Sequence, residues 1–216
     1  VPKEIVTNKD LAQYLDTDDT WIRERTGVKS RHISGDKETT ADMAVKAAEK
    51  ALENSGLLPD EIDLIIVSSV SSNLVLPSTA CFVQKAINAK NAFCFDINVA
   101  CTGFITAYNI SQTFINTGLI NTALIIGAES LSKITDWSDR KTCILFGDGA
   151  GAVVIKKDEN AMFETVMFSN GKNGDALTME NPFALRKTNL GKNHQGQFDI
   201  AFQDIQKTYI NMDGGE

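Results

Sequence analysis

Hydrophobic residues in this chain alternate between short continuous runs and stretches of helical spacing. Residues 63–69 and 122–127 are almost uninterrupted apolar runs, which is typical of strands covered on both faces of a parallel sheet. Residues 92–98 form a further run that is rich in strand-forming residues. Helical spacing is clearest in a set of small and aliphatic residues, namely Ala41, Ala44, Val45, Ala48, Ala51 and Leu52.

The expected helices have recognisable ends. Thr39 and Thr40 supply an N-cap for the helix through Ala41 to Leu52, and Gly56 suits the position after its last turn. Two more helices are expected over 79–87 and 102–116. Strands that alternate with helices imply right-handed crossovers, so the pattern predicts a layered α/β fold.

The later part of the chain is less regular. Residues 144–146 and 152–155 are expected to form strands that frame a glycine-rich turn, and 163–168 to form a last strand. Gly, Asn and Lys then dominate, which is typical of an irregular surface excursion. We therefore expect one α/β unit over 1–168, and over 169–216 an excursion that begins the connection to a further part.

Composition narrows the classes of function. The hydrophobic fraction of 43% allows a sizeable core, while a net charge of −7 and a pI near 4.9 argue against general nucleic-acid binding. No run approaches the roughly 18 apolar residues of a membrane span, and the first residues do not form a signal peptide. Four cysteines without CxxC spacing argue against a zinc knuckle and fit a reducing, cytoplasmic setting. The chain lacks an initiator Met and ends without a closing element, so we expect a truncated piece.

Cys101 is the sharpest chemical feature of the sequence. It lies in a tight turn between an expected strand and the helix that starts near Thr102. Unpaired backbone N–H groups and the positive end of the helix dipole would favour its thiolate. A small packed cysteine is the alternative, and we prefer it for Cys81, Cys94 and Cys143, which lie within helix or strand patterns.

A nucleophilic cysteine needs partners that move protons or stabilise charge. The chain has only two histidines, His32 and His194, and both are expected in solvated loops. The partners of Cys101 are therefore expected outside this chain.

Two other clusters suggest nucleotide binding at first sight. Residues 147–151 have GxGxG spacing and precede a strand, so we reject a dinucleotide-binding turn and favour close packing of two strands beside an active site. Trp21 offers a flat face for a purine, and the neighbouring Arg25 offers a guanidinium for phosphate. An exposed amphipathic turn anchored by Trp21 is the alternative.

Three segments together resemble the β-ketoacyl-acyl carrier protein synthase III family. Residues 16–28 (DTDDTWIRERTGV) are similar to its signature, 98–104 (NVACTGF) to its nucleophile turn and 145–153 to its glycine-rich β-turn. The resemblance implies a thiolase-like fold, an α/β fold with a mixed, mostly parallel sheet, as one half of an α-β-α-β-α architecture. The chain would supply the N-terminal half without its first strand.

The resemblance also implies an acyltransferase that initiates fatty acid synthesis. An acyl group, expected from acetyl-CoA, would pass to Cys101 and then undergo decarboxylative Claisen condensation with malonyl-acyl carrier protein. The Cys101 backbone N–H would help to form an oxyanion hole. The enzyme would be a cytoplasmic homodimer that needs no metal or other cofactor besides its coenzyme A thioester substrate and that binds neither nucleic acid nor membrane. The alternatives are a 3-hydroxy-3-methylglutaryl-CoA synthase or other thiolase relative, and a non-catalytic thiolase-like half that acts in binding.

Matching positions assign the residues that would line the coenzyme A site, which are Thr17, Trp21, Arg25, Thr26, Arg140 and Gly214. Trp21 and Arg140 would enclose the adenine, and Leu76 would reach across the dimer into the partner's acyl pocket. The catalytic His and Asn of the family lie in its second half, and no residue here matches them. A protein that ends at Glu216 is therefore expected not to condense. Its starter acyl group is not fixed by the sequence.

Overall fold

The computed structural model describes residues 1–161, 163–181, 191–192, 198–199 and 208–212. Its helices and strands are β1 (Glu4–Thr7), α1 (Asn8–Leu11), α2 (Asp19–Thr26), β2 (Ser30–Ile33), α3 (Thr40–Ser55), β3 (Leu64–Ser68), α4 (Thr79–Ile87), β4 (Phe93–Ile97), α5 (Gly103–Asn116), β5 (Thr122–Ser130), α6 (Arg140–Cys143), β6 (Asp148–Lys156), β7 (Leu177–Thr178), β8 (Gly191–Lys192), β9 (Phe198–Asp199) and β10 (Asn211–Met212). Short 3₁₀ turns are η1 (Pro59–Glu61), η2 (Ala100–Thr102), η3 (Leu131–Lys133) and η4 (Gly171–Ala176).

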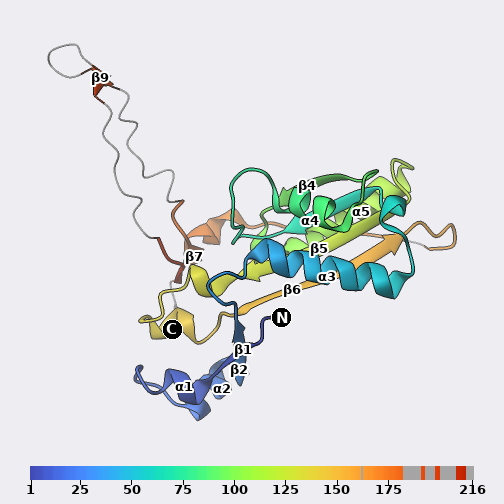
Figure 1. Cartoon of the computed structure of the whole chain (residues 1–216). Helices are drawn as coiled ribbons and strands as arrows, with labels where there is room; N and C mark the ends of the chain where they lie inside the picture. The colour runs from blue at the N-terminus through green and yellow to red at the C-terminus, as the bar shows by residue number, and fades with distance from the viewer. Residues whose placement is uncertain (162, 182–190, 193–197, 200–207, 213–216) are drawn as a thin grey trace.

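A four-stranded sheet with the order β4-β3-β5-β6 forms the centre of the molecule. β3 pairs in parallel with β4 and β5, whereas β6 runs antiparallel to β5. Helices α3 and α4 cover one face and α5 covers the other (Figure 1). The predicted layered α/β fold with a mixed, mostly parallel sheet is thus confirmed.

The apolar run of β3 is explained by this double cover. Ile65 and Val67 belong to the core cluster shared with α3 and α4, while Leu64 and Ile66 belong to the cluster shared with α5. All four side chains are fully buried. Burying one such aliphatic side chain stabilises a fold by about 1.5–3 kcal/mol, so this strand needs no polar positions.

The caps predicted for α3 are present. Thr39 accepts a hydrogen bond from the backbone N–H of Asp42, and the Asp42 side chain accepts one from the Thr39 backbone, which forms a capping box. Gly56 ends the helix with a left-handed φ of 68°. Helix α4 has the expected bounds.

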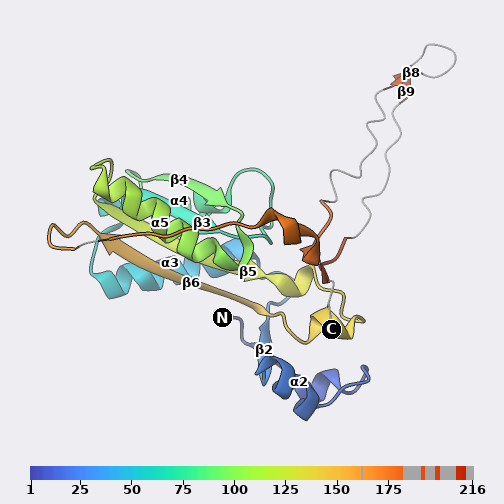
Figure 2. The same ribbon diagram turned by 180° about the vertical axis from the view of Figure 1, so that it is seen from behind.

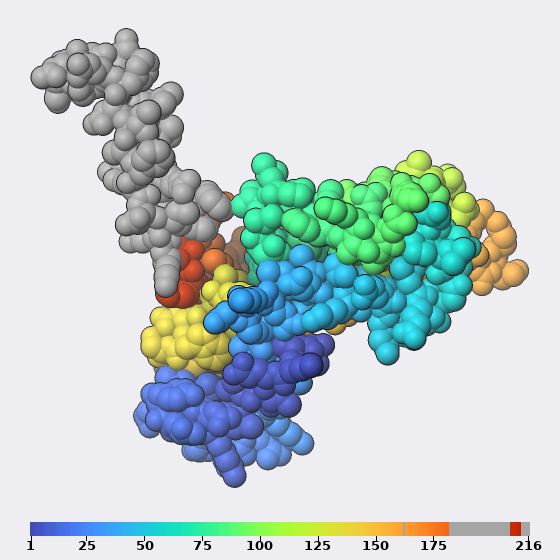
Figure 3. Space-filling view, in the orientation of Figure 1, coloured from blue at the N-terminus to red at the C-terminus, as the bar shows by residue number. Residues whose placement is uncertain are grey.

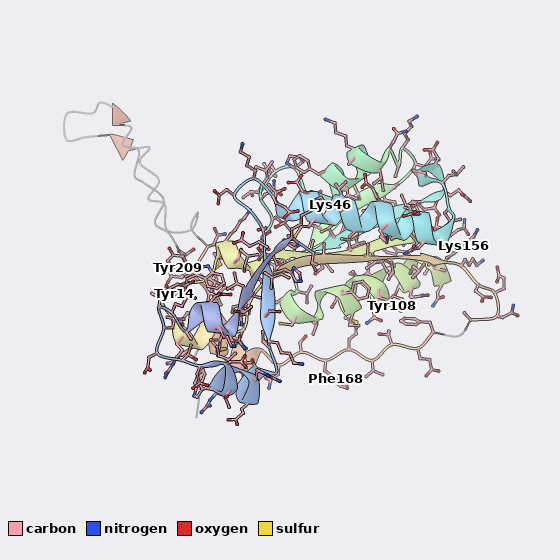
Figure 4. All side chains as sticks on the ribbon, turned by 60° about the horizontal axis from the view of Figure 1, so that its bottom comes forward. Tyr14, Lys46, Tyr108, Lys156, Phe168 and Tyr209 are labelled. Carbon is pink, nitrogen blue, oxygen red and sulfur yellow. The ribbon has the colours of Figure 1, made fainter. Side chains whose placement is uncertain are left out.

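The predictions for the glycine-rich segment and for residues 163–168 are wrong in their details. Gly149 and Gly151 lie inside β6 instead of in a turn, because the long strand β5 pairs with the whole segment, with Gly127 opposite Gly151. Residues 163–168 form no strand, because no other described strand pairs with them. They run past α5, on the side where Tyr108 lies (Figures 2 and 4). The centroids of the Phe163 and Tyr108 rings are 5.5 Å apart.

A small lobe made of β1, α1, α2 and β2 lies below one end of the sheet (Figures 1 and 3). The buried Asp148 at the start of β6 accepts hydrogen bonds from the backbone N–H groups of Ser34, at 2.7 Å, and Ser132, at 2.8 Å. The buried Arg31 of β2 donates to the Ile144 carbonyl at 3.2 Å. These contacts fix the lobe to the sheet. The division of the chain at residue 168 stays a prediction.

No helix in the described ranges is both long and apolar enough to cross a bilayer.

Candidate functional site

Cys101 is exposed in the 3₁₀ turn that joins β4 to α5. Ala100, just before it, has a left-handed φ of 46°, a conformation that residues with a side chain adopt rarely and often at functional sites. The Thr102 hydroxyl donates to the Val99 carbonyl at 3.1 Å and closes the turn. The thiol therefore lies at the leading end of a 14-residue helix and is open to solvent.

The start of α5 packs directly on the end of β3. A Cβ atom added to Gly103 would lie 1.8 Å from Ser68 Oγ and 2.9 Å from Ser68 Cβ. Only a glycine allows this approach. The turn that carries Cys101 is consequently held against the carboxyl end of the central strand.

Trp21 lies in α2, where its backbone N–H donates to the Asp18 side chain at 2.8 Å. The guanidinium carbon of Arg25 is 4.3 Å from the Trp21 ring centroid, and that of Arg140 is 4.8 Å away. Both distances allow cation–π attraction. Arg140 also donates to the Asp16 carbonyl at 2.6 Å. Residues that are 119 positions apart in the sequence thus form one cluster, which we call the Trp21 cluster and define as Trp21, Arg25 and Arg140.

The two predicted threonines differ in their hydrogen bonding. The Thr17 hydroxyl oxygen is buried without a hydrogen-bond partner, and such groups are uncommon because they lose their contact with water. The Thr26 hydroxyl donates to the Ile22 carbonyl at 2.7 Å and accepts from the Val28 N–H at 3.0 Å, so it closes α2. Thr17 therefore has unused bonding capacity, while Thr26 is already engaged by the backbone.

Of the other predicted site residues, Gly214 lies outside the described residues. His194, which was expected in a solvated loop, also lies outside them. Leu76 is 81% exposed, in the loop between β3 and α4. His32 is wrongly predicted as a loop residue: it belongs to β2, is half-buried, and its ring Nδ1 lies 2.7 Å from the Pro2 carbonyl oxygen. Pairing with β1 draws it into the strand.

Cys101 and the Trp21 cluster lie at the same end of the sheet. The parallel strands β3, β4 and β5 have their carboxyl ends at one edge, and the Cys101 turn follows β4 there. The lobe with Trp21 is attached through Asp148, which pairs with Ser130 at the carboxyl end of β5. Ligands of α/β sheets commonly bind at this edge.

Glu129 near the end of β5 fixes the loop that carries Leu76, a role that the sequence analysis missed. Its half-buried carboxylate accepts hydrogen bonds from the Val70 N–H at 3.0 Å and from the hydroxyls of Ser69 and Ser71. At the other end of the same loop, the Asp96 carboxylate caps α4 (Thr79 N–H 2.6 Å, Ala80 N–H 2.8 Å). Two carboxylates therefore fix the ends of the loop that carries Leu76. An acidic residue at the end of an apolar strand was the available signal.

Burial raises the pKa of Glu129 above its ordinary value of 4.5 and outweighs the hydrogen bonds that lower it. The folded chain thus holds a proton more tightly than the unfolded chain, and its stability falls as the pH rises above 4.5 through the folded pKa. We expect Glu129→Gln to remove this decline. Urea unfolding at a series of pH values, with the variant compared to the parent chain, measures it.

Asp42 provides a control, because its effect on the pH dependence of stability is opposite in direction to that of Glu129. Hydrogen bonds from the Thr39 backbone and hydroxyl lower the pKa of Asp42 below 3.8. The contribution of Asp42 to stability is present above pH 3.8 and is lost as the pH falls through the folded pKa. Asp42→Asn should therefore change only the acid side of the curve of stability against pH. An unchanged decline above pH 4.5 in Glu129→Gln would contradict the role given to Glu129.

A shallow hollow of about 360 Å³ lies elsewhere, between α3 and β6. Lys46 and Lys50 are among its lining residues, but no residue of the Cys101 turn or the Trp21 cluster is. Within the described ranges, no three His, Cys, Asp or Glu side chains are grouped so that they could hold a metal ion.

The family match and the similar proteins found by comparison all point to the same family. Residues 95–171 match the family described as 3-oxoacyl-[acyl-carrier-protein (ACP)] synthase III. The chain is 52% identical over 193 residues to a β-ketoacyl-[acyl-carrier-protein] synthase III of Clostridium acetobutylicum, with 87% of this chain and 59% of that protein covered. It is 43% identical over 216 residues to the Streptococcus sanguinis protein of the same name, with 96% and 66% covered.

The structural comparison agrees. The crystal structure of 3-oxoacyl-[acyl-carrier-protein] synthase III from Aquifex aeolicus superposes with a TM-score of 0.75 at 40% identity, covering 99% of this chain and 62% of the other. The chain thus spans about three fifths of the length of such relatives. The matches favour synthase III over the alternative of another thiolase relative. The chain belongs to the β-ketoacyl-acyl carrier protein synthase III family, of which it represents an N-terminal portion.

Proposed function

We propose that this chain is part of a condensing enzyme that initiates fatty acid synthesis. Cys101 accepts an acyl group from acyl-CoA, with acetyl-CoA as the expected donor, and the acyl group then condenses with malonyl-acyl carrier protein. The observation that carries the proposal is the exposed Cys101 thiol, which follows the left-handed Ala100 in the turn before α5. The names of the relatives support it.

The chemistry follows from charge. The Cys101 thiolate attacks the thioester carbonyl carbon, a new C–S bond forms, and the thiolate of coenzyme A leaves. The carbonyl oxygen becomes an oxyanion in between, and the Cys101 backbone N–H stabilises it. Loss of carbon dioxide from the malonyl group yields an enolate that attacks the acyl carbon on Cys101. A C–C bond forms, the C–S bond to Cys101 breaks, and the Cys101 sulfur leaves as a thiolate, ready for the next cycle. The groups that hold the enolate charge are expected in sequence beyond this chain.

The Trp21 cluster is proposed to hold the adenine of coenzyme A, with Thr17, Thr26 and Gly214 nearby. An adenine between Trp21 and Arg140 needs two contacts of about 3.5 Å, whereas Arg140 now lies 4.8 Å from the Trp21 centroid. Arg140 therefore has to swing away from the ring and weaken its contact with Asp16. The unpartnered Thr17 hydroxyl supplies bonding capacity there.

A homodimer is proposed from the loop between β3 and α4. Leu74, Val75 and Leu76 are 46%, 70% and 81% exposed, and three consecutive exposed aliphatic residues suit burial against another surface. Leu76 would then shape the acyl pocket of the partner. We further propose a cytoplasmic enzyme without a metal cofactor.

Condensation of acetyl-CoA with malonyl-acyl carrier protein tests the proposed function. Protein that carries the C-terminal sequence of the family after Glu216 should form acetoacetyl-acyl carrier protein, whereas protein that ends at Glu216 should not. A failure of the longer protein to catalyse condensation would overturn the proposal. Condensation by the 216-residue chain alone would overturn the assignment of the remaining catalytic groups to the missing sequence.

Coenzyme A should quench the fluorescence of Trp21. The chain has two tryptophans, so Trp137→Phe isolates the Trp21 signal. Stacking of adenine on the indole should quench it with saturation, and Arg140→Ala should weaken binding by about tenfold because it removes a contact worth about 1–2 kcal/mol. Lys141→Ala, one residue away in α6, is the matched control. Equal affinities for both variants would contradict the adenine site.

A further inference from the structure

Cys81 and Cys94 lie side by side on neighbouring elements. Cys81 is the third residue of α4 and Cys94 the second of β4, and their sulfur atoms are 3.6 Å apart. Both are free thiols and neither is fully buried. Cys94 faces the side of the sheet that α3 and α4 cover, which is why the two sulfurs meet. A disulfide has an S–S distance of about 2.05 Å, so closure needs an approach of about 1.5 Å.

The surroundings hold this pair in place. Ser78 Oγ donates to Cys81 Sγ at 3.2 Å, and Cys94 Sγ donates to Gln84 Oε1 at 3.6 Å. The Asp96 carboxylate, two residues beyond Cys94, accepts hydrogen bonds from the N–H groups that begin α4. Helix and strand are therefore fixed to each other on either side of the thiols, and closure does not require a long loop to be ordered.

The two thiols differ in reactivity. Burial raises the pKa of Cys94 to about 11, and its contact with Cys81 adds to this effect, so Cys94 stays protonated near neutral pH. Cys81 Sγ, in contrast, accepts a hydrogen bond from the Ser78 hydroxyl and lies in the first turn of α4. Cys81 is thus the thiol that attacks an oxidant, and Cys94 is the one that resolves the product.

We propose that Cys81 and Cys94 form a reversible disulfide when the protein meets a peroxide. The Cys81 thiolate attacks hydrogen peroxide, the O–O bond breaks, and Cys81 sulfenic acid and hydroxide result. The Cys94 sulfur then attacks the Cys81 sulfur and the S–O bond breaks. The leaving hydroxide takes up the Cys94 proton and departs as water. Two thiols are oxidised and one peroxide is reduced to water. The inference is independent of the function proposed for Cys101.

The bond would join two elements that serve the proposed site. Helix α4 follows the loop that carries Leu76, and β4 leads into the turn of Cys101. The oxidised form therefore ties these two parts of the molecule together. A dithiol reductant restores the open form.

Peroxide oxidation of the 216-residue chain in a Cys101→Ser background tests the proposal. Three thiols remain in this variant. After oxidation, Cys81 and Cys94 should both stop reacting with an alkylating reagent, whereas Cys143 should still react once the protein is unfolded. Peptide mapping without reduction should find one cross-linked peptide that contains both residues, and dithiothreitol should restore all three thiols. Cys81→Ser should leave Cys94 alkylatable under the same exposure.

Cys94→Ala is the second variant, and it should let Cys81 stop at sulfenic acid, which dimedone traps. Circular dichroism shows that each variant is folded. Three results would overturn the proposal. Cys94 could stay alkylatable in the oxidised parent, either residue could form a disulfide with Cys143, or the disulfide could form only between two chains.

Discussion

Cys101→Ala is expected to lower acyl transfer from acetyl-CoA by about 10³-fold or more, because a nucleophile that forms the covalent intermediate has no substitute. The variant should keep the fold, since the side chain is exposed and packs little. Mass spectrometry of the protein after acetyl-CoA treatment measures the acyl load, and peptide mapping locates it. Cys101→Ser should load far more slowly than the parent, because a hydroxyl is a weaker nucleophile at neutral pH.

Cys81→Ala is the control, since Cys81 is a partly accessible thiol near the start of a helix, as the exposed Cys101 is near the start of α5. It should load at the rate of the parent. In the folded protein, iodoacetamide should also modify Cys101 faster than the other three thiols. Equal loss of acyl transfer in Cys81→Ala, or equal labelling of all four thiols, would contradict Cys101 as the nucleophile.

The sheet and its helices were predictable because their signals are local. A strand buried on both faces needs a continuous apolar run, and β3 has one; a helix cap needs Thr39 and Asp42 at fixed spacing, and α3 has them. The long pairing of β5 with β6 was not predictable in the same way, because glycine-rich sequence usually indicates a turn. Only the partner strand decides that Gly149 and Gly151 are extended.

In the candidate site, too, features with a local sequence signal were predictable and those that depend on tertiary contacts were not. The turn of Cys101 was visible in the sequence as a strand, a short turn and a helix, whereas the meeting of Trp21 with Arg140 depends on tertiary structure. The family resemblance, and no local pattern, indicated that pair. The contacts of Glu129 with the loop after β3 were missed, because a carboxylate and its partners lie about 60 positions apart. The pairing of Cys81 with Cys94 likewise follows from the packing of α4 on β4.

Gly103→Ala is expected to destabilise the fold by about 2 kcal/mol, although alanine is the better helix former. Gly103 has helical φ and ψ angles of −58° and −45°, so helix propensity alone favours alanine by about 1 kcal/mol. The new Cβ would lie 2.9 Å from Ser68 Cβ, a contact that rotation of the serine hydroxyl cannot relieve, and overpacking of this kind costs up to about 3 kcal/mol. Urea unfolding measures the difference.

The same substitution should slow the labelling of Cys101, because moving the start of α5 away from β3 displaces the turn. Ser68→Gly removes both clashing atoms, so the double variant should be more stable than Gly103→Ala alone, despite the cost of about 1 kcal/mol for glycine in a strand. Gly35→Ala, where a Cβ meets no atom within 4 Å, should leave both measurements unchanged. Additive effects of Gly103→Ala and Ser68→Gly would show that the close approach of α5 to β3 does not hold the Cys101 turn.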